Sequence, residues 1–244
     1  MTRDPMLLAA LALTAVPVAA ALLSGVVAAI RRPGPRTTSA LQHFAAGVVF
    51  AATAIELLPA VLERSPIVAI LGFAAGIVVM FSFRKLGDVI TVRRDARGAT
   101  GFPVGLTVAT GIDFLIDGVI LGAGFAASSA VGVLLTIALA VEYLFVGLSL
   151  SAVLAGTVQR RTVALTPVLL ALLTVAGTAA GVIVLGSASP AVLAGVLAFG
   201  AVAFMYLATE ELLVEAHEKG ETSPGSIGFF IGFLLYLVLS ELIH

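Results

Sequence analysis

The chain has 244 residues, of which 60% are hydrophobic and 11% charged, and its mean hydropathy is +1.18. Soluble domains carry about 25% charged residues, so this composition excludes a soluble protein and indicates an integral membrane protein. The net charge of −1 gives no basic surface for nucleic acid, and the lack of cysteine excludes disulfides and thiolate metal ligands.

Eight apolar runs are long enough to cross a bilayer, which requires about 17–25 residues. In chain order they are 6–30, 40–62, 66–83, 103–127, 130–155, 163–185, 190–214 and 226–243. The first run is too long for the apolar core of a signal peptide, which has about 7–15 residues. We therefore expect an all-α integral membrane protein with eight transmembrane helices, forming one domain over residues 1–244.

The basic residues are distributed unequally between the two sides of this predicted bundle. All but two of the 13 lie in the connections 31–39, 84–102, 156–162 and 215–225. Because lysine and arginine concentrate in cytoplasmic loops, we expect these connections inside the cell and both termini outside. We interpret 84–102 as a plain basic loop. The preference for arginine over lysine favours a bacterial protein, and hence the inner membrane.

Two acidic residues, Asp113 and Asp117, interrupt the apolar run 103–127. A charged side chain within the bilayer costs several kcal/mol, and residues four apart share one face of a helix. The segment 142–147, which begins with Glu142, repeats the pattern of 113–118: an acid, an aromatic residue, leucine, and glycine at the sixth place. We expect the two helices to pack together and hold the three carboxylates around one cation.

Two other interpretations of these acids remain open. The first is a structural polar network in which Thr110 or Ser149 satisfies the carboxylates. The second is an intramembrane aspartyl protease using Asp113 and Glu142, although the Gly-x-Gly-Asp segment of such enzymes is missing. Three acids without a basic partner in the membrane favour a bound cation or exchangeable protons, since unpaired carboxylates at close range repel one another. We therefore expect no enzymatic activity.

Small residues recur at intervals of four in the same two helices. They are Gly118 and Gly122 in the first helix, and Gly147, Ser151 and Ala155 in the second. Small side chains at this spacing let helix backbones approach closely. We interpret them as the surface along which these two helices pack against each other.

An internal repeat relates the second and third helices to the seventh and eighth. Residues 44–59 align with 199–214, which matches Glu56 with Glu211, and the glycines of 72–76 align with those of 228–232. The repeated helices lie five apart, and an odd offset reverses their direction across the membrane. Such inverted repeats are typical of secondary transporters, which bind substrate near the midplane. The repeat leaves the fourth and fifth helices, which carry the acids, as the pair between the two copies.

Four further residues are candidates for a cation pathway. Glu56 and Glu211 are matched by the repeat, near opposite ends of the bundle. His43 begins the second helix, and His217 follows the seventh, both on the predicted cytoplasmic side. Each of the four is also compatible with a side chain that reaches interfacial water.

The order of these elements resembles the ZIP (Zrt/Irt-like) divalent-metal transporters. The resemblance rests on the segment 44–59 with its Glu-Leu-Leu-Pro, on the two acidic helices, and on the segment 203–213. It covers nearly the whole chain. It implies a homodimer of eight-helix subunits, with the helices arranged as three, two and three and related by an inverted repeat of helices 1–3 and 6–8. It also implies uptake of zinc, iron or manganese, with metal bound between the fourth and fifth helices.

The motifs of this family are altered here. In the family's His-Asn-x-Pro-(Glu/Asp)-Gly pattern, Asp113 replaces the histidine, Phe114 the asparagine and Ile116 the proline. In the fifth helix, Tyr143 and Val146 occupy ligand places, so the resemblance implies one all-carboxylate site rather than two adjacent metals. Oxygen ligands suit harder cations such as Mn²⁺. A divergent relative that moves protons or another cation, or that senses metal without transporting it, is the alternative.

Overall fold

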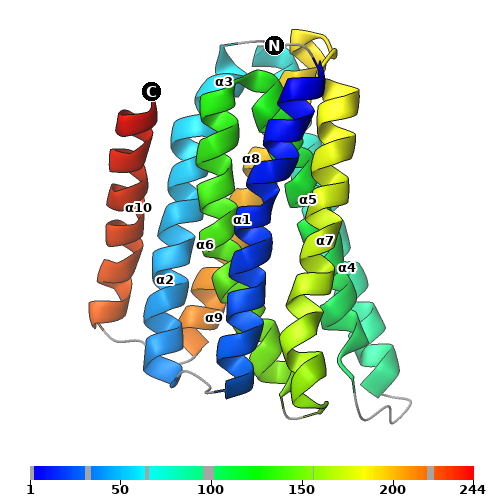
Figure 1. The fold of residues 1–244 in the computed structure, drawn as a ribbon, viewed down its shortest axis with the longest axis vertical. Coiled ribbons are helices and arrows are strands. Elements are labelled where there is room, and N and C mark those ends of the chain that lie inside the picture. The colour runs from blue at the N-terminus through cyan, green and yellow to red at the C-terminus, as the bar shows by residue number, and fades with distance from the viewer. Residues whose placement is uncertain (1–2, 31–33, 64–65, 96–101, 156, 219–222) are drawn as a thin grey trace.

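The computed structural model describes residues 3–30, 34–63, 66–95, 102–155, 157–218 and 223–244. Within these ranges all regular secondary structure is helical, and the long helices run up and down the bundle in Figure 1. The start of α1 and the end of α10 lie at the same end of the bundle (Figure 1). The prediction of an all-α protein is therefore confirmed.

The helices follow one another with short connections. They are α1 (Arg3–Ile30), α2 (Pro35–Ala52), η1 (Thr53–Leu57), α3 (Leu58–Leu62), α4 (Pro66–Asp95), α5 (Val104–Ala127), α6 (Ser129–Leu154), α7 (Arg160–Leu185), α8 (Pro190–Tyr206), η2 (Leu207–Leu212), α9 (Leu213–Glu218) and α10 (Ser223–Ile243). The elements η1 and η2 are single π-helical turns inside otherwise continuous helices. They join α2 to α3 and α8 to α9, so each set forms one span.

Seven of the described spans are long and apolar enough to cross a membrane, and the apolar part of α4, Pro66–Ser82, is somewhat shorter. Large apolar side chains cover their outer faces, including Leu71 and Val78 on α4 and Phe230 and Leu234 on α10, each more than half exposed. An apolar exterior of this kind is stable in lipid and not in water. The composition and the structure thus agree on a multi-pass membrane protein.

One boundary differs from the sequence analysis. We interpreted 84–102 as a loop, but α4 continues without a break to Asp95. Charged residues such as Arg84 and Lys85 end the apolar run, yet arginine and lysine are good helix formers. The end of the apolar run marks a change of surroundings and not the end of the helix. Residues 96–101 lie outside the described part of the chain.

The structure also corrects the predicted packing partner of the small residues. Gly118 and Gly122 do not face α6; they pack on α7, where a Cβ added to Gly118 would lie 2.3 Å from the carbonyl oxygen of Thr174. Gly147 packs on Ser24 of α1 in the same way. The spacing of four was a correct sign of close packing, but spacing alone does not identify the neighbouring helix.

The remaining contacts form a regular scheme. The outer helix α10 packs on α2, the outer helix α4 packs on α8, and α1 and α7 pack on each other and flank the α5–α6 pair. In Figure 1, α10 and α4 stand at opposite flanks of the bundle. The acidic helices α5 and α6 consequently lie between the two flanks, where most of their polar side chains are enclosed by protein.

Candidate metal centre

A very short connection makes α5 and α6 antiparallel neighbours. Only Ser128 separates them, in an extended conformation, and its hydroxyl accepts a hydrogen bond from the Val131 amide over 3.1 Å. This is a standard helix N-cap, which satisfies one of the free amides at the start of α6. The tight reversal holds the carboxylate-bearing segment of α5 beside the matching segment of α6.

Asp113, Asp117 and Glu142 meet between these two helices. One carboxylate oxygen from each lies within 4.8 Å of the others, and they are the only such group of acids or histidines among the described residues. Asp117 and Glu142 are buried, with 1% and 0% of their surfaces exposed, and Asp113 is half-buried. Metal–oxygen bonds of about 2.0–2.6 Å would let one cation touch all three.

The carboxylates are poorly satisfied by the protein. Asp117 accepts a hydrogen bond from the Tyr143 hydroxyl over 3.3 Å, but neither oxygen of Glu142 has a hydrogen-bond partner among the described residues. No lysine or arginine of the described chain pairs with any of the three acids. Buried charges are normally paired or coordinate a metal, so the cluster requires a cation or bound protons.

An aromatic stack closes one side of the cluster. The rings of Phe114 and Tyr143 are parallel to within 13°, with centroids 3.7 Å apart, and both side chains are fully buried. The Tyr143 hydroxyl also hydrogen-bonds with Thr174 of α7. The stack therefore fills the space beside the acids with ring atoms while supplying a single hydroxyl to Asp117.

A fourth acid acts on the cluster from η2. The Glu211 carboxylate interacts electrostatically with Asp113, Asp117 and Glu142, although its own side chain is exposed. Its negative charge adds to that of the three acids. Glu211 is therefore the pathway candidate that lies near the carboxylates.

The chain matches the family described as ZIP Zinc transporter over residues 99–240, which is more than half of its length and includes all three acids. The chain belongs to the ZIP zinc transporter family. No curated protein matches the sequence. Membership of the ZIP family makes this a multi-pass membrane protein from a family that transports divalent metals.

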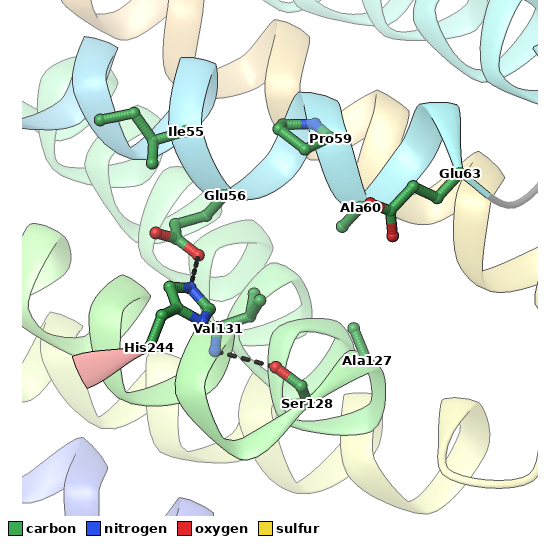
Figure 2. A pocket seen from close by; sticks show the side chains of 9 residues that line it. All are labelled: Ile55, Glu56, Pro59, Ala60, Glu63, Ala127, Ser128, Val131 and His244. Atoms are coloured by element: carbon green, nitrogen blue, oxygen red, sulfur yellow. Dashed lines mark hydrogen bonds and ion pairs between the residues drawn. The ribbon is translucent and has the colours of Figure 1, made fainter. Parts of the chain in front are cut away.

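The second pathway candidate, Glu56, lies apart from the three acids of this ZIP protein. It is 2% exposed, accepts a 2.7 Å hydrogen bond from the Ser240 hydroxyl, and pairs with His244 over 3.2 Å. Figure 2 shows Glu56 and His244 facing each other at a pocket of about 390 Å³. The pocket is lined by Ile55, Glu56, Pro59, Ala60, Glu63, Ala127, Ser128, Val131 and His244.

The two histidine candidates meet at the other end of the bundle. His43 of α2 is buried, with 2% exposed, and its ring centroid lies 5.1 Å from that of His217 on α9. His217 itself is exposed. Sequence position suggested only that both are near the same membrane surface. The structure brings the rings into contact, away from the carboxylate cluster.

Several partners in this site were not identified from sequence. Thr110 and Ser149, which we considered as partners for the acids, instead bond the Leu106 carbonyl and Gln42. The hydroxyl that reaches Asp117 comes from Tyr143, which we interpreted only as a lost ligand. The available signal was its phenol hydroxyl in an apolar helix, because a buried tyrosine hydroxyl usually finds a hydrogen-bond partner.

Proposed function

We propose that the chain carries a divalent cation across a bacterial inner membrane through a single site formed by Asp113, Asp117 and Glu142, between α5 and α6. The observation that carries this proposal is the convergence of three carboxylates, one of which has no hydrogen-bond donor in the part of the chain that the structure describes. Family membership supports the class of substrate. The geometry supports the location, because one divalent cation would offset two of the three carboxylate charges, for which the described residues provide no basic partner.

The ligand chemistry favours a hard cation. All three ligands are carboxylates, and the chain has no cysteine and only three histidines, none of them in this cluster. Oxygen ligands suit Mn²⁺ better than Zn²⁺ or Fe²⁺, which commonly recruit imidazole or thiolate. Zinc, iron and manganese are all candidate substrates of this site. We expect the site to prefer Zn²⁺ over Mn²⁺ less strongly than a histidine site would.

One ion, rather than two adjacent ions, would occupy this site. The stacked rings of Phe114 and Tyr143 take up the space that a second metal would need, and they offer no carboxylate or imidazole. Two-metal sites place their ions about 3.5–4 Å apart. We propose a single transport-site ion for each chain.

An inverted repeat would allow the protein to alternate between a state open to the outside and a state open to the cytoplasm. The π-helical turns η1 and η2 carry Glu56 and Glu211, the acids that the sequence repeat matches. The repeat matches α2 with α8 and α10 with α4. The packing is matched too, since α10 packs on α2 and α4 packs on α8. These features support a 3+2+3 arrangement in which the two halves rock about the α5–α6 pair.

The close contacts of the outer helices support the same repeat in detail. A Cβ added to Gly72 would meet the Gly195 carbonyl, and one added to Gly228 would meet the Ala40 carbonyl. Gly195 and Ala40 are themselves matched positions, because both lie four residues before the aligned Phe199 and Phe44. Corresponding glycines therefore approach corresponding carbonyls in the two halves.

We propose that the ion reaches the cluster from the outer end of the bundle and leaves it toward the cytoplasmic end. The pocket beside Glu56 would be the outer entrance, and Glu211, His43 and His217 would lie on the cytoplasmic side. This orientation follows the basic connections, with both termini outside. We also propose a single transmembrane domain and, from the family resemblance, a homodimer.

The orientation can be tested directly because the chain contains no cysteine. Single cysteines at Arg160 and at Glu63 should react with a membrane-impermeant thiol reagent only from the inside and only from the outside, respectively. Reversed labelling would overturn the orientation and leave the metal site untouched.

Transport through the cluster can be tested in proteoliposomes. The purified protein should accumulate Mn²⁺ or Zn²⁺ down an imposed gradient, and Glu142→Gln should abolish the uptake. Glu56→Gln changes a buried acid outside the cluster, beside the proposed entrance, so it should slow uptake without abolishing it. If metal binds to the wild type with no uptake under any gradient, the protein is a sensor and not a transporter.

A further inference from the structure

The two acids that the sequence repeat matches, Glu56 and Glu211, lie in the same kind of backbone distortion. Glu56 belongs to the π-turn η1 and Glu211 to the π-turn η2, and the described residues form no other π-helical turn. In both turns the amide that follows bonds a carbonyl five residues earlier, as that of Leu58 does with Thr53. Single π-turns inside α-helices are frequent at functional sites. The repeat therefore preserves a local distortion together with an acid.

The carboxylates of these two acids have different surroundings. That of Glu211 interacts electrostatically with all three acids of the cluster. That of Glu56 accepts a 2.7 Å hydrogen bond from Ser240 and pairs with His244 over 3.2 Å, and both partners belong to α10. Transporters built from inverted repeats expose their site to the two sides of the membrane in turn. Each half can therefore adopt, in the opposite state, the arrangement that its counterpart shows here.

The residues that hold Glu56 belong to a polar row along α10. Ser240 and His244 are four residues apart, so they share one face of the helix, and Tyr236 lies on that face one turn earlier. The Tyr236 side chain is fully buried, and its hydroxyl has no hydrogen-bond partner among the described residues. It interacts electrostatically with Glu56. A buried hydroxyl without a partner is costly, and a carboxylate is the acceptor nearest in kind.

The polar row leads from the outer end of the bundle toward its middle. At about 1.5 Å per residue, Tyr236 lies about 12 Å deeper than His244, and Ser240 lies halfway between them. Glu56 is bonded at the two outer positions of the row. The Tyr236 hydroxyl therefore offers the Glu56 carboxylate a further donor, one turn closer to the middle of the membrane.

His244 lies between the Glu56 carboxylate and water. The side chain of His244 is 50% exposed, whereas that of Glu56 is 1% exposed. The two face each other at the outer pocket, which Glu63 also lines (Figure 2). An ion that enters the pocket from outside therefore reaches Glu56 only if His244 moves away from it.

The backbone beside Glu56 contains a hinge. Pro59 has no amide hydrogen, so the Ile55 carbonyl lacks the α-helical hydrogen bond that the residue four positions later normally donates. The π-turn adds a second irregularity to the same segment. Helices bend at prolines and at π-turns. The segment can therefore change its direction here without breaking a regular run of α-helical bonds.

We propose that Glu56 is a mobile carboxylate of the outer entrance. In the state seen here, Ser240 and His244 hold it and it joins α2 to α10. When the outer side opens, Glu56 leaves these partners, turns about η1 toward the cluster and accepts the incoming cation. Both of its oxygens are bonded now, so it becomes a ligand only by leaving them. The inference rests on the proposed function, since it needs a cation that travels to the cluster.

Charge and shape distinguish this role from a structural one. Glu56→Gln keeps the length of the side chain and an acceptor for Ser240, whereas Glu56→Asp is shorter and keeps the charge. In proteoliposomes Glu56→Gln should slow the initial uptake of Mn²⁺ by about 10-fold, since charges at an entrance raise the rate of cation capture by that order. Glu56→Asp should slow it less. The opposite order would make Glu56 a structural acceptor and overturn the proposal.

Glu63→Gln is the matched control for charge at the entrance. It removes a carboxylate from the same pocket, but Glu63 is exposed and lies outside the π-turn. It should slow Mn²⁺ uptake less than Glu56→Gln does. Equal slowing by the two changes would show that the pocket only attracts cations and that Glu56 does not hand them on.

The hold of α10 on Glu56 can be tested without transport. A cysteine at Thr53, which is 1% exposed and lies one turn deeper than Glu56, is labelled from outside with a membrane-impermeant thiol reagent. Ser240→Ala/His244→Ala should raise its labelling rate several-fold, because the outer side opens more often. Leu242→Ala, on the lipid-facing side of α10 and 77% exposed, is the control and should leave the rate unchanged. The same rate in both backgrounds would exclude the hold.

The two experiments keep this inference separate from the proposed function. If Glu142→Gln abolishes uptake while the Glu56 variants match the wild type, the cluster stands and the mobile carboxylate is excluded. If the wild type takes up no metal, transport through the cluster fails. The labelling of Thr53→Cys then decides whether α10 holds Glu56: a higher rate in Ser240→Ala/His244→Ala supports the motion, and an unchanged rate overturns it.

Discussion

Two buried acids of this protein, Glu56 and Glu142, have the same burial and opposite surroundings. Glu56 is 2% exposed and is bonded by Ser240 and His244, whereas Glu142 is 0% exposed and has no donor among the described residues. Burial alone therefore does not mark an ion site. The missing donor distinguishes the two acids, because buried polar groups are normally hydrogen-bonded, and we propose that a metal satisfies Glu142.

The largest expected effect is the loss of metal binding on Glu142→Gln. The change keeps the shape of the side chain but removes the charge that the protein leaves unpaired. We expect metal affinity to fall by more than about 100-fold, beyond the range usual for residues outside the ligand shell. Glu56→Gln, the matched change, should reduce affinity far less. Isothermal titration of both variants with Mn²⁺ measures the difference, and equal losses would remove the distinction between the two acids.

The second expected effect concerns pH. Protons and the metal compete for the three carboxylates, so metal affinity should fall as the pH is lowered. Asp117→Asn removes one competing group. We expect weaker binding and a flatter pH dependence between about pH 5 and 8, a range in which buried carboxylates can titrate. Parallel pH curves for wild type and variant would show that Asp117 is a structural residue.

The contrast between the two acids also shows what sequence could predict. We could predict from sequence that the three acids meet. Asp113 and Asp117 are four residues apart and so share a helix face, and the segment at Glu142 matches theirs. The surroundings of Glu56 were not predictable. Its partner His244 lies 188 residues away, and no local pattern encodes a contact of that range.

The same division applies to the fold. Apolar length predicted the spans, since the bilayer imposes a minimum length on each helix. It did not predict that α4 continues to Asp95, because leaving the apolar region does not end a helix. The small residues indicated close packing but assigned it to the wrong neighbour, since Gly118 contacts α7 and Gly147 contacts α1. Sequence spacing defines a face, and only the tertiary structure defines what covers it.

A third prediction compares the thermal stability of the Glu142 and Glu56 variants in metal-free protein. Glu142→Gln removes a charge whose burial is uncompensated, so the apparent melting temperature in detergent with chelator should stay constant or rise. Glu56→Gln weakens a hydrogen-bonded pair worth about 1 kcal/mol, which lowers the melting temperature by about 2–4 °C in a chain of this size. A fall of the same size in both variants would mean that Glu142 is a structural acid like Glu56.

The smallest expected effect is that of the Tyr143 hydroxyl, which donates a hydrogen bond to the cluster. Its 3.3 Å bond to Asp117 is long, and long hydrogen bonds are weak, so it should orient the carboxylate more than it neutralises it. Tyr143→Phe keeps the stack with Phe114 and should weaken Mn²⁺ binding by about 10-fold, as for a residue that orients a metal ligand.

The control for this change is Thr178→Val on α7. The Thr178 hydroxyl is buried, like that of Tyr143, but it has no hydrogen-bond partner among the described residues. It lies one turn from Thr174, which does contact the tyrosine. Its removal should leave metal affinity unchanged, since the hydroxyl is not bonded to the cluster. If Thr178→Val and Tyr143→Phe weaken binding equally, the loss reflects a general change in α7 packing, and the donor to Asp117 has no part in holding the metal.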